Sequence, residues 1–102
     1  MTFDDLNLNK PLLLALKKMG LQKPTPIQYK SFNTIMSGKD VCGIAQTGTG
    51  KTFAYLLPIL RQFVFTNDKT PTVIILVPTR ELVLQVLKAA KVLSASMSIE
   101  IQ

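Results

Sequence analysis

The chain has 102 residues, and its 12 lysines and arginines against 6 aspartates and glutamates give a net charge of +6 at pH 7. A chain of this length holds one small folded domain at most, and its basic balance favours an anionic partner such as a nucleotide, a nucleic acid or an acidic membrane. Histidine is absent, which excludes Ser-His-Asp and Cys-His catalysis as well as histidine-ligated metals. The single cysteine, Cys42, can form no disulfide within the chain and suits a reducing compartment.

The sequence gives no sign of membrane insertion or secretion. The longest uncharged runs, such as 41–50 and 70–79, have about ten residues and contain Gly or Pro, so they are too short to span a bilayer. The first five residues, Met-Thr-Phe-Asp-Asp, are acidic and lack the basic region and apolar stretch of a signal peptide. We therefore expect a cytoplasmic protein with no membrane partner.

Two helices are predicted in the N-terminal part of the chain. Asn9 can cap a first helix, which carries apolar residues on one side and ends at Gly20. Thr25 followed by Pro26 is the typical start of a second helix, because Thr is a good cap and Pro fits the first helical position. This second helix is predicted to end at Gly38.

The remainder of the chain alternates apolar runs with helical segments. Residues 41–45 and 73–77 are short, apolar and bounded by turn residues, which predicts two buried strands. A helix that is apolar on almost every side and kinked by its internal proline is predicted over 52–64, and another helix over 80–93. Residues 98–102 alternate like the start of a third strand. The order α-α-β-α-β-α-β predicts an α/β fold with a parallel β-sheet, flanking helices and right-handed crossovers.

A glycine-rich segment lies between the first predicted strand and the long apolar helix. It reads Ala-Gln-Thr-Gly-Thr-Gly-Lys-Thr over 45–52, with Ala45 where the strict phosphate-loop pattern has Gly. Glycines at this spacing let backbone N–H groups turn towards one point at a helix N-terminus, which forms a phosphate site. Lys51 would reach the β- and γ-phosphates, and the Thr52 hydroxyl would ligate Mg²⁺. The predicted nucleotide-binding residues of this loop are Gln46, Thr47, Gly48, Thr49, Gly50, Lys51 and Thr52.

Two residues upstream of this loop could recognise a purine base. Gln28 ends the sequence Lys-Pro-Thr-Pro-Ile-Gln, and a glutamine amide offers a donor and an acceptor that match adenine N6 and N7. Phe3 is an isolated aromatic residue in a polar surround and could stack on the base. Each residue also has an ordinary structural explanation. A Gln in a first helical turn is commonly solvated or caps the helix, and a terminal Phe commonly pins the chain to the core.

A third segment joins the second predicted strand to the last helix. Pro78 ends the strand, Thr79 can cap the helix, and Arg80 opens it. A hydroxyl and a guanidinium at a helix N-terminus, at the end of a parallel strand, suit the phosphate backbone of a nucleic acid. The alternative is a simple turn in which Arg80 forms a surface ion pair, for example with Glu81.

Together, these segments resemble the DEAD-box family of ATP-dependent RNA helicases. Residues 20–28 resemble the family's Q motif, 45–52 resemble motif I and 78–82 resemble motif Ia. The resemblance implies part of a RecA-like P-loop domain. Residues 1–40 would form a Q-motif helical region, and residues 41–102 the N-terminal part of the first ATP-binding RecA-like domain.

The resemblance also implies a role for each site residue. Lys51 and Thr52 would hold the phosphates and Mg²⁺, and Leu21 stands where the family usually has Phe or Tyr. ATP and Mg²⁺ are the implied cofactors, and RNA and a second RecA-like domain are the implied partners. The residues implied beside the adenine are Phe3, Leu21, Lys23, Thr25 and Gln28, and those near the RNA backbone are Pro78, Thr79 and Arg80.

Other motifs of the family are not present in the sequence. It contains neither Asp-Glu-Ala-Asp nor Ser-Ala-Thr, and neither Asp40 nor Glu81 has the placement of the missing catalytic acids. We expect the parent protein to be an ATP-dependent RNA helicase that unwinds short duplexes or remodels RNA–protein complexes. The chain itself, cut within the first RecA-like domain, would bind ATP weakly and turn it over negligibly. The alternatives are a non-catalytic nucleotide- or RNA-binding module and a different P-loop enzyme, such as a small-molecule kinase.

Overall fold

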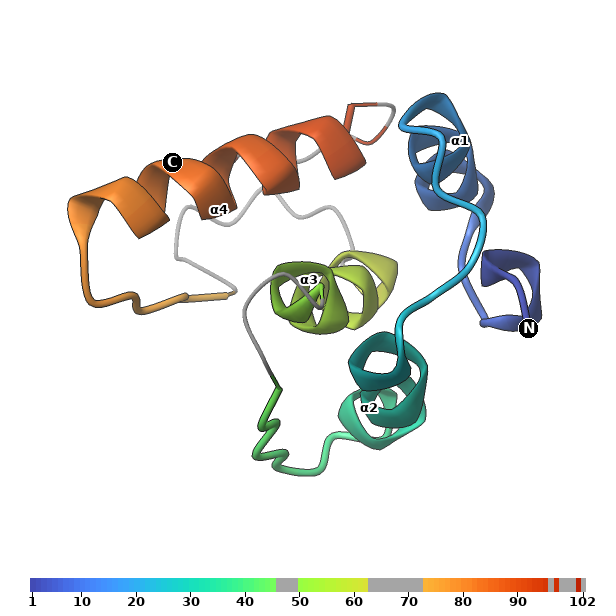
Figure 1. The fold of residues 1–102 in the computed structure, drawn as a ribbon, viewed down its shortest axis with the longest axis horizontal. Coiled ribbons are helices and arrows are strands. Elements are labelled where there is room, and N and C mark those ends of the chain that lie inside the picture. Colours follow the sequence, from blue (N-terminus) through green and yellow to red (C-terminus); the bar gives the residue numbers. More distant parts are fainter. Residues whose placement is uncertain (46–49, 63–72, 96, 98–100, 102) are drawn as a thin grey trace.

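The computed structural model describes residues 1–45, 50–62, 73–95, 97 and 101. Within these residues, α3 is the central element, and it contacts each of the other three α-helices. In Figure 1, α2 lies below α3, α4 lies above it and α1 lies to the right. The most extensive of these helix contacts joins α2 to α3. The elements are η1 (Phe3–Asp5), α1 (Lys10–Lys18), α2 (Pro26–Met36), α3 (Lys51–Gln62) and α4 (Arg80–Leu93).

Local sequence signals set the N-terminal ends of α1 and α4. The Asn9 side chain accepts a hydrogen bond from the backbone N–H of Leu12 at 3.2 Å. The Thr79 hydroxyl accepts one from the backbone N–H of Leu82 at 3.1 Å. Each bond satisfies a helix N–H that has no partner within its own helix, a contribution of about 1 kcal/mol. Both caps and both helices are confirmed.

The ends of α1 and α2 also follow the prediction. Gly20 and Gly38 come just after these helices and have φ values of +77° and +81°. This left-handed conformation favours glycine because a Cβ atom would meet steric resistance from the backbone there. At its other end, α2 begins at Pro26 after Thr25, as the pairing of these two residues predicts. The second predicted helix is therefore confirmed at both ends.

The core forms where the apolar sides of the helices meet. α3 buries residues on several faces, including Leu56, Leu57 and Pro58, which agrees with its nearly all-round apolar sequence. The helix continues past Pro58 to Gln62. No helix in the described part of the chain is long and apolar enough to cross a membrane. The buried cluster consists of Phe3, Leu6, Leu12, Ala15, Leu16, Phe32, Leu56, Leu57, Leu60, Ala90 and Leu93.

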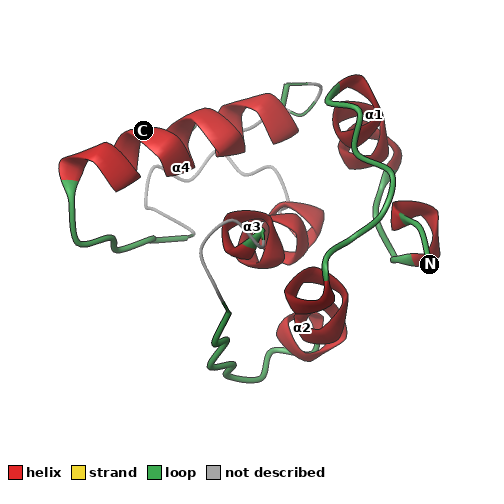
Figure 2. Ribbon diagram, in the orientation of Figure 1, coloured by secondary structure: helices red, strands yellow, loops and turns green. Residues whose placement is uncertain are grey.

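The predicted parallel β-sheet is wrong for the residues that the structure describes. Residues 41–45 and 73–77 contain no strand, and Figure 2 shows helices joined only by loops over these ranges. The third predicted strand, 98–102, lies outside the described residues except for Ile101, which is not in a strand. The described architecture is therefore helical, and the α/β assignment from the sequence is corrected.

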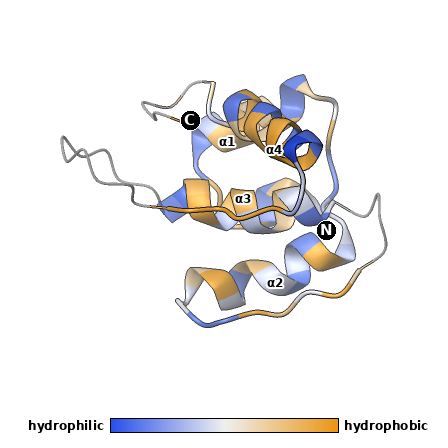
Figure 3. Cartoon of the chain, turned by 90° about the vertical axis from the view of Figure 1, so that its left-hand side faces the viewer, coloured by the Kyte–Doolittle hydropathy of each residue, from blue (hydrophilic) through white to orange (hydrophobic). Residues whose placement is uncertain are grey.

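The physical reason is that an apolar, β-branched run forms a strand only beside a partner. Strand propensity measures how well a side chain packs on neighbouring strands, so it has little force where no neighbour pairs. Neither run is buried as predicted, because Ile44 is 91% exposed and Leu76 is 90% exposed. Figure 3 shows apolar stretches that lie outside the helices. The two runs connect helices and do not form the core.

Removal of a core side chain from α1 should destabilise the whole described fold. Leu12 is fully buried among residues of other helices, so Leu12→Ala should lower the free energy of unfolding by about 2–5 kcal/mol. Leu84→Ala is the matched control, because Leu84 lies on α4 and is 59% exposed, and it should change stability by about 0.5 kcal/mol or less. Urea unfolding followed by circular dichroism measures both. If Leu12→Ala lowered the free energy of unfolding no more than Leu84→Ala does, α1 would not be part of the core.

Candidate functional site

The phosphate-loop residues that the structure describes lie at the N-terminal end of α3. Gly50 precedes the helix with a φ of +84°, and Lys51 is the first helical residue. The Lys51 side chain is exposed, and Thr52 is half-buried beside it. The predicted residues Gln46, Thr47, Gly48 and Thr49 lie outside the described residues.

The N-terminal end of α3 is electrostatically suited to an anion. Aligned peptide dipoles give a helix a partial positive charge at its N-terminus. The first turn of α3 contains no acidic side chain that would neutralise this charge, and Lys51 adds a full positive charge. The helix has 12 residues and is anchored in the core by Leu56, Leu57 and Leu60. A phosphate group would therefore meet a fixed positive end, which is the chemistry that the loop predicts.

Gln28 joins the start of α2 to the start of α3. Its side-chain Oε1 accepts a hydrogen bond from the Thr25 backbone N–H at 3.0 Å, and its Nε2 donates to the Gly50 carbonyl at 3.2 Å. The residue is only 5% exposed. The first bond is the capping interaction that the sequence offered as the structural explanation of Gln28. The second brings the Q-motif segment and the phosphate loop together across 22 residues of sequence.

The junction around Gly50 is crowded. The Gly50 carbonyl also accepts a hydrogen bond from the Ala54 backbone N–H at 3.0 Å, which is the first bond of α3. A Cβ atom at position 50 would collide with Gln28 Nε2 and would lie 3.2 Å from Thr25 Oγ1. That Thr25 oxygen is buried and has no hydrogen-bond partner among the described residues. Only glycine fits this position without a shift of its neighbours.

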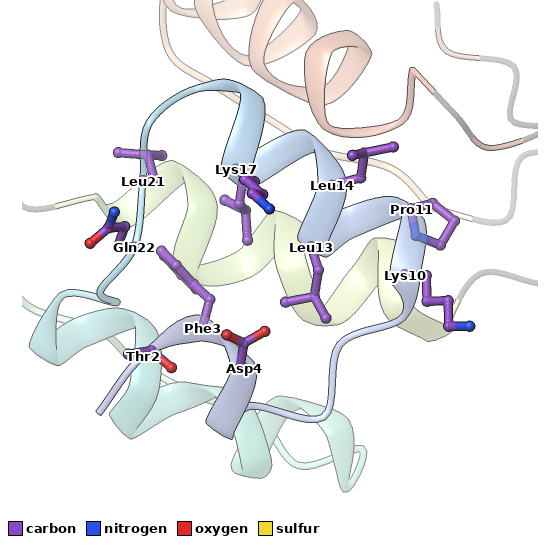
Figure 4. A pocket seen from close by; sticks show the side chains of 11 residues that line it. Thr2, Phe3, Asp4, Lys10, Pro11, Leu13, Leu14, Lys17, Leu21 and Gln22 are labelled. Carbon is purple, nitrogen blue, oxygen red and sulfur yellow. The ribbon is translucent and has the colours of Figure 1, made fainter.

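Phe3 lies in the core cluster and is 4% exposed, so it pins the N-terminal segment to the body of the molecule. Its backbone N–H donates to the Gln22 carbonyl at 3.0 Å, which places η1 against the segment before α2. Phe3, Leu21 and Gln22 line one part of a groove of about 790 Å³ that continues along α1 (Figure 4). Leu21 is 39% exposed there, whereas Lys23 and Gln28 are not among the lining residues.

The predicted RNA-backbone residues lie apart from the N-terminal segment. Pro78, Thr79 and Arg80 are all exposed, and the Thr79 hydroxyl already caps α4. In Figure 1, α4 begins on the left of the molecule and the N-terminus lies on the right. The structure therefore brings together Thr25, Gln28 and Gly50 and leaves the three residues around the start of α4 as a separate surface.

Two side chains at the end of α3 make long-range contacts that the sequence analysis missed. Arg61 Nε donates to the Asn7 carbonyl at 2.7 Å, and Gln62 Nε2 donates to the Met36 carbonyl at 2.9 Å. The only signal in the sequence is a pair of polar residues that ends an apolar helix. The described residues contain no group of three or more His, Cys, Asp or Glu side chains that could hold a metal ion.

Substitution of Gly50 should be more harmful than the same substitution at Gly38. Both glycines have a φ above +80°, so an alanine is strained by about 1–2 kcal/mol at either position. A Cβ atom at Gly38 meets nothing within 4 Å, whereas at Gly50 it collides with Gln28. Gly50→Ala should therefore cost at least about 1 kcal/mol more than Gly38→Ala in urea unfolding. Equal costs would mean that the contact with Gln28 is not maintained in solution.

Comparisons with known proteins identify the family of the chain. The sequence model of the family described as DEAD/DEAH box helicase matches residues 25–102. The chain is 45% identical over 101 residues to a probable ATP-dependent RNA helicase DDX27 of Bos taurus, which covers 97% of this chain and 13% of that protein. It is 48% identical over 88 residues to the ATP-dependent RNA helicase DeaD of Escherichia coli K12, covering 86% of this chain and 14% of that protein. The chain thus spans only a small part of these relatives.

Solved structures give the same result. The RNA helicase Prp28 of Chaetomium thermophilum, bound to ADP, matches with a TM-score of 0.87 and 33% identity over 96% of this chain and 25% of that one. A DEAD box protein of Methanococcus jannaschii matches with a TM-score of 0.81 and 36% identity over 91% of this chain and 25% of that one. With a family match over most of its length and relatives at this level of identity, the chain belongs to the DEAD/DEAH box helicase family.

Proposed function

We propose that this chain is the ATP-binding portion of an ATP-dependent RNA helicase. The observation that carries the proposal is the hydrogen bond from Gln28 to Gly50, because it joins the Q-motif segment to the phosphate loop directly before Lys51. Relatives of the chain are named ATP-dependent RNA helicases, and the similar Prp28 structure holds ADP. In this proposal residues 1–40 form the Q-motif region, and residues 41–102 belong to the ATP-binding domain.

The triphosphate would bind at the N-terminal end of α3. The exposed Lys51 ammonium would contact the β- and γ-phosphates, and backbone N–H groups of the loop would surround them. Thr52 would contribute its hydroxyl to Mg²⁺, and phosphate oxygens and water would supply most of the other ligands. When bound, Mg²⁺ would neutralise phosphate charge.

Adenine recognition by Gln28 is compatible with its hydrogen bonds. A glutamine amide has two N–H donors and can accept two hydrogen bonds at its oxygen. The contacts to Thr25 and Gly50 use one donor and one acceptor, which leaves one of each. One donor and one acceptor are what adenine N7 and N6 require. Capping α2 and reading a base are therefore not mutually exclusive roles.

The remaining proposed adenine contacts come from the N-terminal groove and the segment before α2. Phe3 and Leu21 line the same groove, so their apolar surfaces could approach one base. Leu21 replaces the aromatic residue usual in the family, and we expect looser packing against the base as a result. The Lys23 stem would lie against the ring, and Thr25 would stay close to the Gln28 amide, to which its N–H donates.

RNA and a second RecA-like domain are the proposed macromolecular partners. Pro78, Thr79 and Arg80 present an exposed helix start, which suits contact with a phosphate backbone and not with base edges. The net charge of +6 supports affinity for a polyanion. A cytoplasmic location is part of the proposal and rests on the sequence, whose single cysteine, the exposed Cys42, suits a reducing compartment.

Binding without turnover is the proposed activity of the chain by itself. The sequence contains no Asp-Glu-Ala-Asp, Asp40 lies before the 41–45 run, and Glu81 lies in the first turn of α4. Neither acid is in the phosphate loop or in the first turn of α3. Phosphoryl transfer depends on groups that position water and stabilise charge, so a phosphate site alone gives little rate enhancement.

Lys51→Ala should weaken ATP binding by about 10-fold or more, because it removes the positive charge that would face the triphosphate. Lys91→Ala is the control, since Lys91 is an exposed lysine in the last turn of α4, and it should leave the affinity unchanged. Titration of a fluorescent ATP analogue measures both. The wild-type chain should show no RNA-stimulated ATPase. Turnover that Lys51→Ala abolishes would overturn the proposal that the chain binds ATP without hydrolysing it.

Gln28→Ala should remove a preference for ATP over GTP. A bidentate amide contact discriminates between bases by about 1–3 kcal/mol, so the wild-type preference should be about 5-fold or more. Competition of ATP and GTP against a labelled nucleotide measures the ratio. Gln85→Ala on the exposed side of α4 should keep it. Equal affinities of the wild-type chain for ATP and GTP would contradict the role of Gln28.

A further inference from the structure

The last turn of α3 fastens two separate parts of the chain. Arg61 donates from Nε to the Asn7 carbonyl at 2.7 Å, 54 residues away in sequence. The next residue, Gln62, donates from Nε2 to the Met36 carbonyl at 2.9 Å and lies 3.3 Å from the Met36 sulfur. Neighbouring side chains of one turn therefore hold different segments: Arg61 the N-terminal segment, and Gln62 the end of α2.

The N-terminal segment is held by the burial of two side chains and by hydrogen bonds to other parts of the chain. Its only helix, η1, is a single 3-10 turn of three residues. Phe3 and Leu6 are buried, and the Phe3 N–H is bonded to the Gln22 carbonyl at 3.0 Å. Terminal segments are poorly ordered unless such contacts tie them down. The hydrogen bond from Arg61 to Asn7 anchors the C-terminal end of this segment.

We propose that Arg61 is a positioning residue for the nucleobase. The proposal rests on the proposed function, in which Phe3 lies beside adenine. Arg61 bonds Asn7, which lies two residues after the 3-10 turn Phe3–Asp5, and the Phe3 ring lines the same groove as Leu21 and Gln22. Arg61 has no contact with the base itself. It acts by holding Phe3 where the ring can contact a base.

Arg61 contributes both a charge and a hydrogen bond at the end of α3. A cation in the last turn of a helix interacts favourably with the negative end of the helix dipole, whatever bond it makes. The bond to Asn7 needs an N–H donor at that place. Arg61→Met keeps the apolar stem and loses both charge and donor, whereas Arg61→Lys keeps the charge and a flexible donor. A partial rescue by lysine is therefore expected.

Amide hydrogen exchange tests whether Arg61 holds the N-terminal segment. In the 102-residue chain, Arg61→Met should speed exchange of the Phe3 amide about 10-fold, the loss expected for one charge-assisted hydrogen bond. Gln62→Met is the matched control, because it alters the same turn but releases Met36 instead. It should leave the Phe3 amide unchanged. The Val86 amide in α4 reports global unfolding, so a rise at Phe3 alone separates local release from general loss of stability.

Nucleotide competition tests the consequence for the base. Because an aromatic ring stacks on any base, Arg61→Met should weaken binding of ATP and GTP by a similar factor, about 3-fold or more, and leave their ratio as in the wild type. Arg61→Lys should recover part of the affinity, and Gln62→Met should keep it. A wild-type chain that binds ATP together with an Arg61→Met variant of unchanged affinity would overturn the positioning role alone. A wild-type chain that binds neither nucleotide would overturn the proposed function, and the positioning role with it.

Discussion

The burial of α3 is the constraint on which the rest of the structure depends. An apolar helix with side chains buried on several faces cannot lie at the surface, so it becomes the element that the other helices cover. The first residue of this helix is Lys51, and its last two are Arg61 and Gln62. Burial of the middle of the helix therefore fixes the position of both ends, one at the phosphate loop and the other at the N-terminal segment and the end of α2.

Gln28 shows how one side chain can serve the fold and the proposed site together. Its amide caps α2, bonds the residue that precedes α3 and still has a donor and an acceptor unused by these contacts. Because the amide is nearly buried, its orientation is set by the protein before any ligand arrives. Pre-orientation of this kind lowers the entropy cost of binding. The capping contact and the proposed contact with a base would thus use different hydrogen-bonding positions of the same amide.

Local signals in the sequence predicted local structure well. Asn9, Thr25 and Thr79 each start a helix, and Gly20 and Gly38 each follow one, because caps and left-handed turns depend on a few adjacent residues. The strands predicted at 41–45 and 73–77 were wrong because a strand forms only beside a neighbouring strand, and the composition of a run does not show whether it has one.

The contacts that assemble the candidate site could not be predicted from the sequence, because they too depend on distant partners. The bonds from Gln28 to Gly50 and from Arg61 to Asn7 join residues 22 and 54 positions apart, and no periodicity encodes such a pairing. The motif residues could be identified as candidates, but the sequence could not show which of them meet. Gln46, Thr47, Gly48 and Thr49, which complete the predicted phosphate loop, lie outside the described residues.

The chain is similar to solved helicase structures although its described residues form no sheet. The path of the backbone and the pairing of strands are therefore separate features, although a fold class combines them. The path of the backbone is set here by helix packing and by the contacts at helix ends, since those are the interactions that the described residues make. Strand pairing would add stability to such a path but is not needed to define it. The exposed Ile44 and Leu76 side chains remain in water in the folded chain as in the unfolded one, so they add almost nothing to its stability. The stability of the described fold therefore rests on the core around α3, and the bonds of Gln28 and Arg61 connect the two ends of α3 to the segments that cover it.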